Sequence, residues 1–150
     1  MACHQHLLYH IVFSTKRRVG VITPAVEKRV WSALGAASNK HHVTPVQIGG
    51  VEDHVHVLVS APRTKAPSQI VQYVKGSSSR WINASIPELD GFAWQTGYGI
   101  FSVSRSVVRT TARYIANQRA HHAHFSFEDE YLKLLQQHSV KIEDSRFLWD

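Results

Sequence analysis

The chain has 150 residues, 43% of them hydrophobic, which suits one compact domain with a buried core. No apolar run reaches the roughly 18 residues of a membrane span, the first residues do not follow a signal-peptide pattern, and one cysteine, Cys3, excludes a disulfide framework or a thiolate zinc cage. With 17 Lys and Arg against 11 Asp and Glu, the net charge of +6 predicts a polyanionic partner such as nucleic acid, although charge alone also fits a solvated basic surface.

The first half of the chain predicts a strand, a helix and two further strands. Residues 7–14, rich in β-branched and aromatic side chains, form the first strand, and a basic loop follows over 15–20. Thr23 is expected to cap a helix with Pro24 at its first position, and the four-residue spacing of apolar side chains carries that helix to about Asn39. The strands 43–50 and 54–60 are close enough in sequence to pair as an antiparallel hairpin.

The second half predicts a helix over 68–83, with Ile70, Val74 and Trp81 on its buried face. Residues 92–103 favour one or two strands, and Ser104 or Ser106 can cap a third helix over roughly 107–120. An amphipathic helix over 127–138 precedes a tail that holds Phe147, Leu148 and Trp149.

This order of elements predicts an α+β, ferredoxin-like fold: an antiparallel sheet with helices packed mainly on one face and an extra C-terminal helix. Residues 1–125 hold 14 basic and 5 acidic side chains, whereas residues 126–150 hold 3 and 6. The acidic helix and tail over 126–150 are therefore distinct in charge, and we expect them to belong to the same domain as 1–125.

The most distinctive motif is Asp53-His54-Val55-His56, inside the alternating apolar run "GGVEDHVHVLVSAP". Residues i and i+2 of a strand point to the same face roughly 7 Å apart, so both imidazoles can bind one metal ion. Asp53 points to the opposite strand face and is a poor ligand candidate. By itself, such a histidine pair is more often incidental than a metal site.

Further reactive side chains fall in the predicted helix 107–120. Tyr114 and Gln118 are four residues apart and share one helical face. Tyrosine can attack phosphorus once it is deprotonated or metal-assisted, and Gln118 can add an oxygen ligand to His54 and His56. Such a site, with positions open for water and phosphate oxygens, suits Mg²⁺ or Mn²⁺ acting on a phosphodiester. Taken singly, each residue also fits a packing or surface role.

Other chemistries that use two alternating histidines lack their remaining residues here. A histidine-triad nucleotide hydrolase needs a third alternating histidine where this chain has Leu58. A nucleobase deaminase needs H-x-E with a later P-C-x-x-C, and neither occurs. A facial iron triad needs a carboxylate ligand, which Asp53 is badly placed to supply.

Five segments together resemble the HUH single-tyrosine transposases of small bacterial insertion sequences (the IS-two-hundred group) and their relatives associated with repetitive extragenic palindromes. They are "YHIVFSTKRR", "GGVEDHVHVLVSAP", "VKGSSSRWIN", "WQTGYGIFSVS" and "ARYIANQ", in the family's order over most of residues 7–120. The histidine-hydrophobic-histidine motif is then His54-Val55-His56, and the later Tyr-x-x-x-Gln is Tyr114 and Gln118.

The resemblance implies a transposase that acts on single-stranded DNA whose ends fold into imperfect hairpins. His54, His56 and Gln118 would hold Mg²⁺ or Mn²⁺, and Tyr114 would form a 5′-phosphotyrosine bond and release a 3′-hydroxyl. The resemblance also implies a bacterial cytoplasmic protein associated with the nucleoid. It implies a homodimer in which the tyrosine helix of one subunit is able to complete the other's site.

Hairpin binding would use basic side chains as phosphate contacts, which set affinity rather than sequence choice. Three candidates lie in the loop after the first strand, two on the second helix and four on or beside the tyrosine helix: Lys16, Arg17, Arg18, Lys75, Arg80, Arg105, Arg109, Arg113 and Arg119. For each one, an ordinary solvated charge is an equally weighted alternative. Trp94, Tyr98 and Phe101 could stack on unpaired bases, but packing in the core is the favoured role.

Two rival functions stay open at this point. One is a domesticated relative that processes chromosomal palindromes without mobilising an element, and the other is a hairpin-binding module without catalysis. The presence of His54, His56, Tyr114 and Gln118 together argues against the second.

Overall fold

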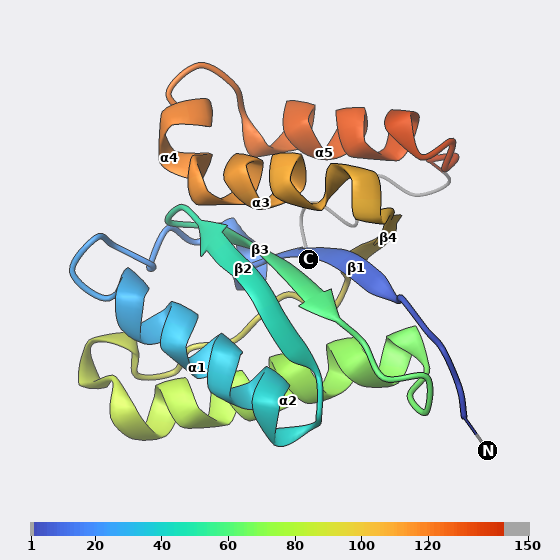
Figure 1. Ribbon diagram of the computed structural model, residues 1–150. Coiled ribbons are helices and arrows are strands. Elements are labelled where there is room, and N and C mark those ends of the chain that lie inside the picture. Colours follow the sequence, from blue (N-terminus) through green and yellow to red (C-terminus); the bar gives the residue numbers. More distant parts are fainter. Residues whose placement is uncertain (1, 143–150) are drawn as a thin grey trace.

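A four-stranded antiparallel sheet in the order β2-β3-β1-β4 forms the centre of the fold (Figure 1). The computed structural model describes residues 2–142, so the predicted tail with Phe147, Leu148 and Trp149 lies outside them. β2 and β3 form the predicted hairpin, and β1 pairs with both β3 and β4. The α+β class is confirmed. The strands are β1 (Leu8–Ser14), β2 (Thr44–Gly50), β3 (His54–Ser60) and β4 (Gly99–Val103).

The alternation of side chains along β1 and β3 gives the sheet two different faces, because successive strand residues point in opposite directions. Phe13 and Val57 point into the larger apolar core. Val12 pairs with His56 in the register between β1 and β3, and Val12 belongs to a second, smaller cluster on the other face. The two histidines of the motif therefore point away from the larger core.

Helices α1 (Glu27–Lys40) and α2 (Pro67–Ser85) cover the face with the larger core (Figure 1). Their apolar side chains recur every three or four residues, which places them on one side of each helix. Two short 3₁₀ turns, η1 (Lys16–Arg18) and η2 (Pro87–Leu89), lie after β1 and after α2. The buried apolar residues of the two helices are Val30, Ala33, Leu34, Ala37, Ile70, Val71, Val74 and Ile82.

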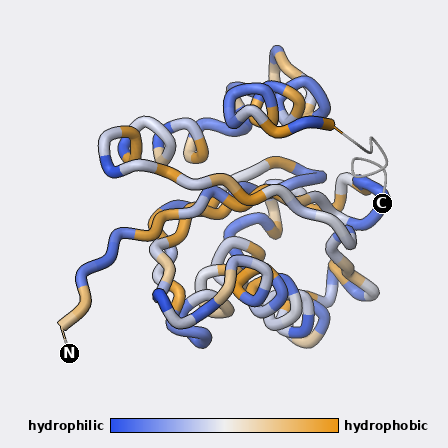
Figure 2. Tube along the Cα trace, turned by 90° about the vertical axis from the view of Figure 1, so that its right-hand side faces the viewer, coloured by the Kyte–Doolittle hydropathy of each residue, from blue (hydrophilic) through white to orange (hydrophobic). Residues whose placement is uncertain are grey.

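The helices that follow β4 lie on the opposite face, so the sheet is the middle of three layers (Figures 1 and 2). The prediction of helices mainly on one face therefore needs correction. Its cause is that β1 and β4 also carry apolar residues towards the second face, where Val12 and Phe101 pack with Phe127, Tyr131 and Leu134. The elements of this layer are η3 (Arg105–Val107), α3 (Val108–Ala116), α4 (Gln118–His121) and α5 (Phe127–Gln137).

Helix α3 approaches β2 very closely at Gly49. A Cβ atom added to Gly49 would lie 2.3 Å from the carbonyl oxygen of Ile115, whose side chain is fully buried. Only glycine fits beneath this turn of α3. The contact therefore fixes the height of α3 above the sheet and, with it, the position of the neighbouring Tyr114.

Several element boundaries differ from the sequence prediction. Thr23 does not cap α1. Its carbonyl accepts the amides of Val26 and Glu27, so a separate turn precedes the helix. The expected helix 107–120 is interrupted at Asn117, and only 99–103 of the expected strand 92–103 is regular. Trp81, expected on a buried helix face, is 42% exposed because its side of α2 points away from the sheet.

Among residues 2–142, no helix combines the length and the apolar character needed to cross a bilayer.

Candidate active site

His54 and His56 lie next to each other on β3 and are completely buried. His54 Nδ1 is 2.7 Å from Asp53 Oδ1, and His56 Nδ1 is 2.8 Å from Nε2 of His10 on β1. Each ring therefore has its Nδ1 engaged, and both Nε2 atoms face one carboxylate oxygen of Glu130. Asp53 stays outside the shared space, as expected, but it orients the ring of His54.

Tyr114 and Gln118 are brought to the two histidines within the same chain. Gln118 Oε1 is 3.2 Å from His54 Nε2, and the ring centroids of Tyr114 and His56 are 5.8 Å apart. Gln118 is 1% exposed and opens α4, whereas Tyr114 belongs to the last turn of α3. The break at Asn117 thus does not prevent the two side chains from reaching the same site.

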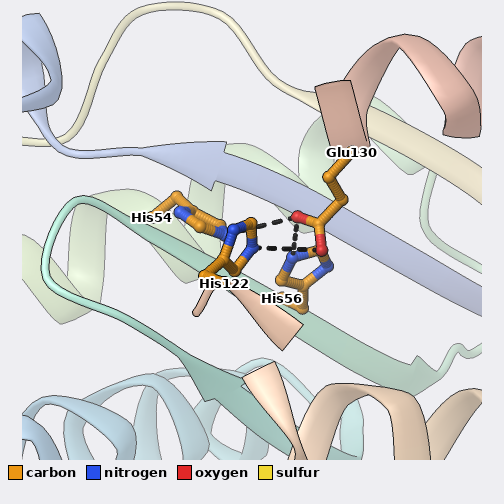
Figure 3. Close-up of side chains that lie close together, drawn as sticks. All are labelled: His54, His56, His122 and Glu130. Atoms are coloured by element: carbon orange, nitrogen blue, oxygen red, sulfur yellow. Dashed lines mark hydrogen bonds and ion pairs between the residues drawn. The ribbon is translucent and has the colours of Figure 1, made fainter. Parts of the chain in front are cut away.

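A fifth side chain, Glu130 of α5, occupies the centre of the site (Figure 3). Its Oε1 lies 2.8 Å from His56 Nε2 and 3.3 Å from His54 Nε2. Its Oε2 accepts hydrogen bonds from the Tyr114 hydroxyl and, at 3.0 Å, from the Gln118 amide. The sequence prediction missed Glu130. Its signal was an acidic residue on the apolar side of an amphipathic helix, between Phe127 and Leu134.

His122, just after α4, is the second residue that the sequence prediction missed. Its Nε2 lies 3.0 Å from Gln118 Oε1 and 3.2 Å from Glu130 Oε2, while its Nδ1 donates to the carbonyl of Phe125. The cluster of histidines at 121, 122 and 124 was the available signal.

Burial and hydrogen bonding act against each other in this site. Burial raises the pKa of a carboxyl, but hydrogen bonds from His122, His54 and His56 hold the pKa of Glu130 well below its usual range. Burial lowers the pKa of His54, and the contacts with Asp53 and Glu130 more than offset it, so that this pKa is raised. Burial and Glu130 together raise the pKa of Tyr114. Glu130 is thus ionised and Tyr114 is a neutral phenol at neutral pH.

The donor atoms fit a divalent cation. His54, His56, His122 and Glu130 each offer one ligand atom, and these atoms lie within 4.8 Å of one another. Gln118 adds an amide oxygen beside His54. The Nδ1 contacts of His54 and His56 are the kind of outer contact that fixes a ligating imidazole. These nitrogen and oxygen donors could hold a divalent metal ion.

The predicted phosphate contacts fall into three groups. Arg105, Arg109 and Arg113 are exposed at four-residue spacing along η3 and α3, and they make no ion pair within residues 2–142. Lys16 and Arg17 are exposed beside Arg18, which lies 3.6 Å from Asp53 and over the ring of Phe127. The exposed stripe on α3 lies on the element that carries Tyr114.

The remaining basic candidates lie elsewhere. Lys75 directs its ammonium at the carbonyls of residues 95, 96 and 97. Arg119 pairs with Glu27 and Glu52, and Arg80 lies beside Trp81 on the α1–α2 layer. These three side chains are therefore engaged within the chain or distant from the histidines.

The aromatic residues considered for base stacking pack within the protein. Trp94 lies edge-on against Phe13 and Phe92, and Phe101 packs near Tyr131. Tyr98 is half-buried against the larger core. The favoured packing role agrees with these contacts.

A cleft of about 450 Å³ opens onto Tyr114 and Glu130 between β4, α3 and α5. Its walls combine apolar side chains such as Val107 and Leu134 with the polar Thr110 and Lys133. A cleft of this size is ample for a nucleotide. The cleft gives access to the site on the side where Tyr114 lies.

Comparison with known proteins places this geometry in a family context. Residues 3–118 match the family model described as "Transposase IS200 like". The chain is 27% identical over 117 residues to the ISDra2 transposase TnpA of Deinococcus radiodurans, which covers 75% of this chain and 84% of the relative.

Two solved structures have a similar fold. A crystal structure of a protein described as a transposase of Deinococcus radiodurans aligns with a TM-score of 0.64 and 25% identity over 79% of this chain and 95% of its own. A REP-associated tyrosine transposase bound to a REP hairpin aligns with a TM-score of 0.58 over 81% of this chain and 74% of its own. At 12% identity, this second likeness shows the fold alone.

Proposed function

Since the chain belongs to the IS200-like transposase family, we propose that it cleaves and rejoins single-stranded DNA with hairpin ends through a covalent bond to Tyr114. The observation that carries this proposal is the placement of the Tyr114 hydroxyl beside the His54–His56 pair in one buried site. A basic chain with an exposed arginine stripe on the tyrosine helix supports a DNA substrate.

The chemistry assigns separate tasks to the residues of the site. His54, His56 and Gln118 would hold Mg²⁺ or Mn²⁺, which when bound acts as a Lewis acid on the scissile phosphate. Tyr114 Oη gives up its proton and attacks phosphorus, the bond from phosphorus to the 3′-oxygen breaks, and the 5′-phosphate stays on Tyr114. The 3′-oxygen takes up one proton, so that the net number of bound protons does not change. The phosphodiester energy is kept in the new bond, so a 3′-hydroxyl can later attack it and rejoin DNA.

The phenol proton is the main obstacle to this attack. Burial and the carboxylate of Glu130 raise the pKa of Tyr114, so the side chain enters the reaction protonated. The hydroxyl donates its hydrogen bond to Glu130 Oε2. Attack therefore requires this hydrogen bond to be exchanged for the phosphate.

The substrate path follows from the cleft and the charges. The cleft between β4, α3 and α5 would admit the cleaved strand, and Arg105, Arg109 and Arg113 would contact phosphates along α3. A similar fold bound to a REP hairpin supports a hairpin as the bound DNA. A homodimer in the bacterial cytoplasm, associated with the nucleoid, completes the proposal.

The proposal is tested with a labelled single-stranded oligonucleotide that carries an imperfect hairpin from the DNA flanking the gene. We expect a covalent protein–DNA adduct with Mn²⁺ or Mg²⁺, its loss in EDTA, and its loss in Tyr114→Phe by at least about 10³-fold, since no other group replaces the nucleophile. Tyr73→Phe, which alters a tyrosine stacked on His41, is the matched control and should keep the adduct.

An adduct that persists in Tyr114→Phe would show that another residue is the nucleophile. Hairpin binding without any adduct from the unaltered protein would favour the rival function of a binding module. A domesticated processing role shares the chemistry and differs in its DNA: hairpin-flanked single copies of the gene indicate transposition, and scattered palindromes indicate processing.

A further inference from the structure

Glu130 is the most completely surrounded charged side chain of the site. It is 4% exposed, and its two oxygens face different partners. Oε1 faces Nε2 of His54 and of His56, whereas Oε2 faces Tyr114, Gln118 and His122. A buried carboxylate normally requires a compensating partner, and here its neighbours are imidazoles (Figure 3), the Gln118 amide and the Tyr114 phenol.

The Nε2 atoms of His54 and His122 point at the side-chain oxygens of Gln118 and Glu130. The Nδ1 atoms of His54 and His122 face Asp53 Oδ1 and the carbonyl of Phe125, both acceptors, so each Nδ1 carries the ring proton. Both Nε2 atoms lie within 3.3 Å of oxygen atoms of Gln118 and Glu130. Ring protons bridge these contacts without a cation, and a divalent cation that displaces the protons would meet the same nitrogen and oxygen atoms.

The orientation of Gln118 strengthens this argument. Its amide nitrogen donates to Glu130 Oε2, which turns Oε1 towards Nε2 of both His54 and His122. The reversed amide would place its oxygen against the carboxylate. The Gln118 oxygen therefore faces the same space as the two imidazole Nε2 atoms.

Two of the separations are close to those between neighbouring ligands on one ion. Ligands bonded at about 2.0–2.2 Å lie roughly 3.0 Å from their neighbours in an octahedral shell and roughly 3.4 Å in a tetrahedral one. The observed separations are 2.8 Å between His56 Nε2 and Glu130 Oε1, and 3.2 Å between His122 Nε2 and Glu130 Oε2. The four ligand atoms all lie within 4.8 Å of one another, so the set must contract slightly to bind one cation.

We infer that Glu130 and His122 are ligands of the divalent cation held by His54 and His56, so that the metal site extends into α4 and α5. Glu130 links the cation to the nucleophile, because its other oxygen accepts the Tyr114 hydroxyl. Three imidazoles and one carboxylate form a nitrogen-rich set that prefers a transition metal such as Mn²⁺ to Mg²⁺, which favours oxygen ligands and keeps its waters.

This inference rests on the proposed function only for the identity of the site, and metal binding is measured without DNA. Mn²⁺ titrations of the full chain, followed by electron paramagnetic resonance of free Mn²⁺, should give an affinity that falls 10- to 100-fold in Glu130→Gln and in His122→Gln. Competition should show Mg²⁺ binding at least 10-fold more weakly than Mn²⁺. Asp129→Asn and His124→Gln, at exposed neighbouring positions, should bind Mn²⁺ as the unaltered chain does.

Circular dichroism in EDTA checks that each variant folds. If Glu130→Gln does not fold, Glu130→Asp, which keeps the charge on a shorter side chain, should fold and still lose Mn²⁺ affinity. Unchanged Mn²⁺ affinity in Glu130→Gln overturns the inference, and increased affinity shows instead that Glu130 competes with the cation. If the unaltered chain does not cleave DNA, the proposed function is wrong, but the measured Mn²⁺ affinities still test the metal ligands.

Discussion

His10 extends the site by one residue beyond the proposed metal ligands. Its ring lies on β1 with Nε2 2.8 Å from His56 Nδ1, and it is 4% exposed. For His56 Nε2 to bind a cation, its Nδ1 must carry the proton and donate it to His10. His10 must then be neutral, which makes it a positioning residue for His56.

The pKa of His10 predicts acid sensitivity of the fold. Burial, followed by the charge of His56, lowers this pKa to about 3. The unfolded chain binds the proton near pH 6.5 and the native chain only near 3, so stability is full above 6.5 and is lost as the pH falls through this window. Between pH 7 and pH 5, His10 should account for a loss of about 2 kcal/mol in the free energy of unfolding.

Urea denaturation at pH 7, 6 and 5 in EDTA measures this loss. His10→Gln should lose about 2 kcal/mol less than the unaltered chain over that range, whereas His4→Gln, at an exposed position, should follow the unaltered chain. Equal losses in all three proteins would contradict a neutral, buried His10.

Residues that interact through local spacing were predictable, and those that depend on long-range docking were not. The period-2 pattern placed His54 and His56 on one face, and the four-residue spacing kept Tyr114 and Gln118 together. Glu130 is 74 residues from His56, and its charge resembles that of an ordinary surface helix residue. Only the docking of α5 against the sheet identifies it as buried.

At the scale of elements, the contact between α3 and β2 determines the position of Tyr114, the proposed nucleophile. Gly49 lies under Ile115, and an added Cβ would meet a backbone oxygen, which cannot rotate away as a flexible side chain can. The β2–β3 hairpin and α3 can therefore approach each other this closely only because residue 49 has no side chain.

Gly49→Ala should therefore push α3 away from the sheet. We expect a loss of about 1–3 kcal/mol in the free energy of unfolding, as for other overpacked sites, and a loss of adduct formation larger than the fraction unfolded explains. Gly76→Ala is the control. Gly76 is exposed within α2 with open space around its Cβ position, so it should gain about 0.5–1 kcal/mol.

Thermal melts and the adduct assay on Gly49→Ala and Gly76→Ala test these two expectations. A Gly49→Ala protein with unaltered stability and full adduct yield would show that α3 is free to shift without consequence for the site.

Element types were predicted better than element ends. The hairpin, the helix over α2 and the acidic helix α5 follow from hydrophobic periodicity, which is a property of many residues at once. The start of α1 and the break at Asn117 depend on single hydrogen bonds, such as the one that the Glu27 amide donates to the Thr23 carbonyl. Local capping patterns could not distinguish a helix start from a preceding turn.

For the whole molecule, the question is whether one chain forms a complete site. The family resemblance allows the tyrosine helix of one subunit to serve the other, yet Tyr114, Gln118 and Glu130 all meet the histidines of their own chain. Only Asn117 separates α3 from α4, so Gln118 cannot stay with these histidines while Tyr114 moves far. One chain therefore holds all the residues of a complete site, and we predict that each site uses its own tyrosine helix.

Mixing two inactive variants tests this assignment. Tyr114→Phe and His56→Ala subunits, unfolded together and refolded, should form no more adduct than either variant alone if each site belongs to one chain. A shared site would restore a substantial part of the adduct, because one site of a mixed dimer would hold an intact tyrosine and an intact histidine pair. Refolding the unaltered chain by the same route provides the control for recovery.

The acidic helix α5 lies beyond the region that matches the family model, yet it contributes a side chain to the site. The region that matches the family model ends at residue 118, while the carboxylate at the centre of the site lies at residue 130. The region that matches the family model is therefore shorter than the region that encloses the site. Chains that share the matched region but follow it with different helices would differ in their innermost charge, and thus in the ions on which they depend.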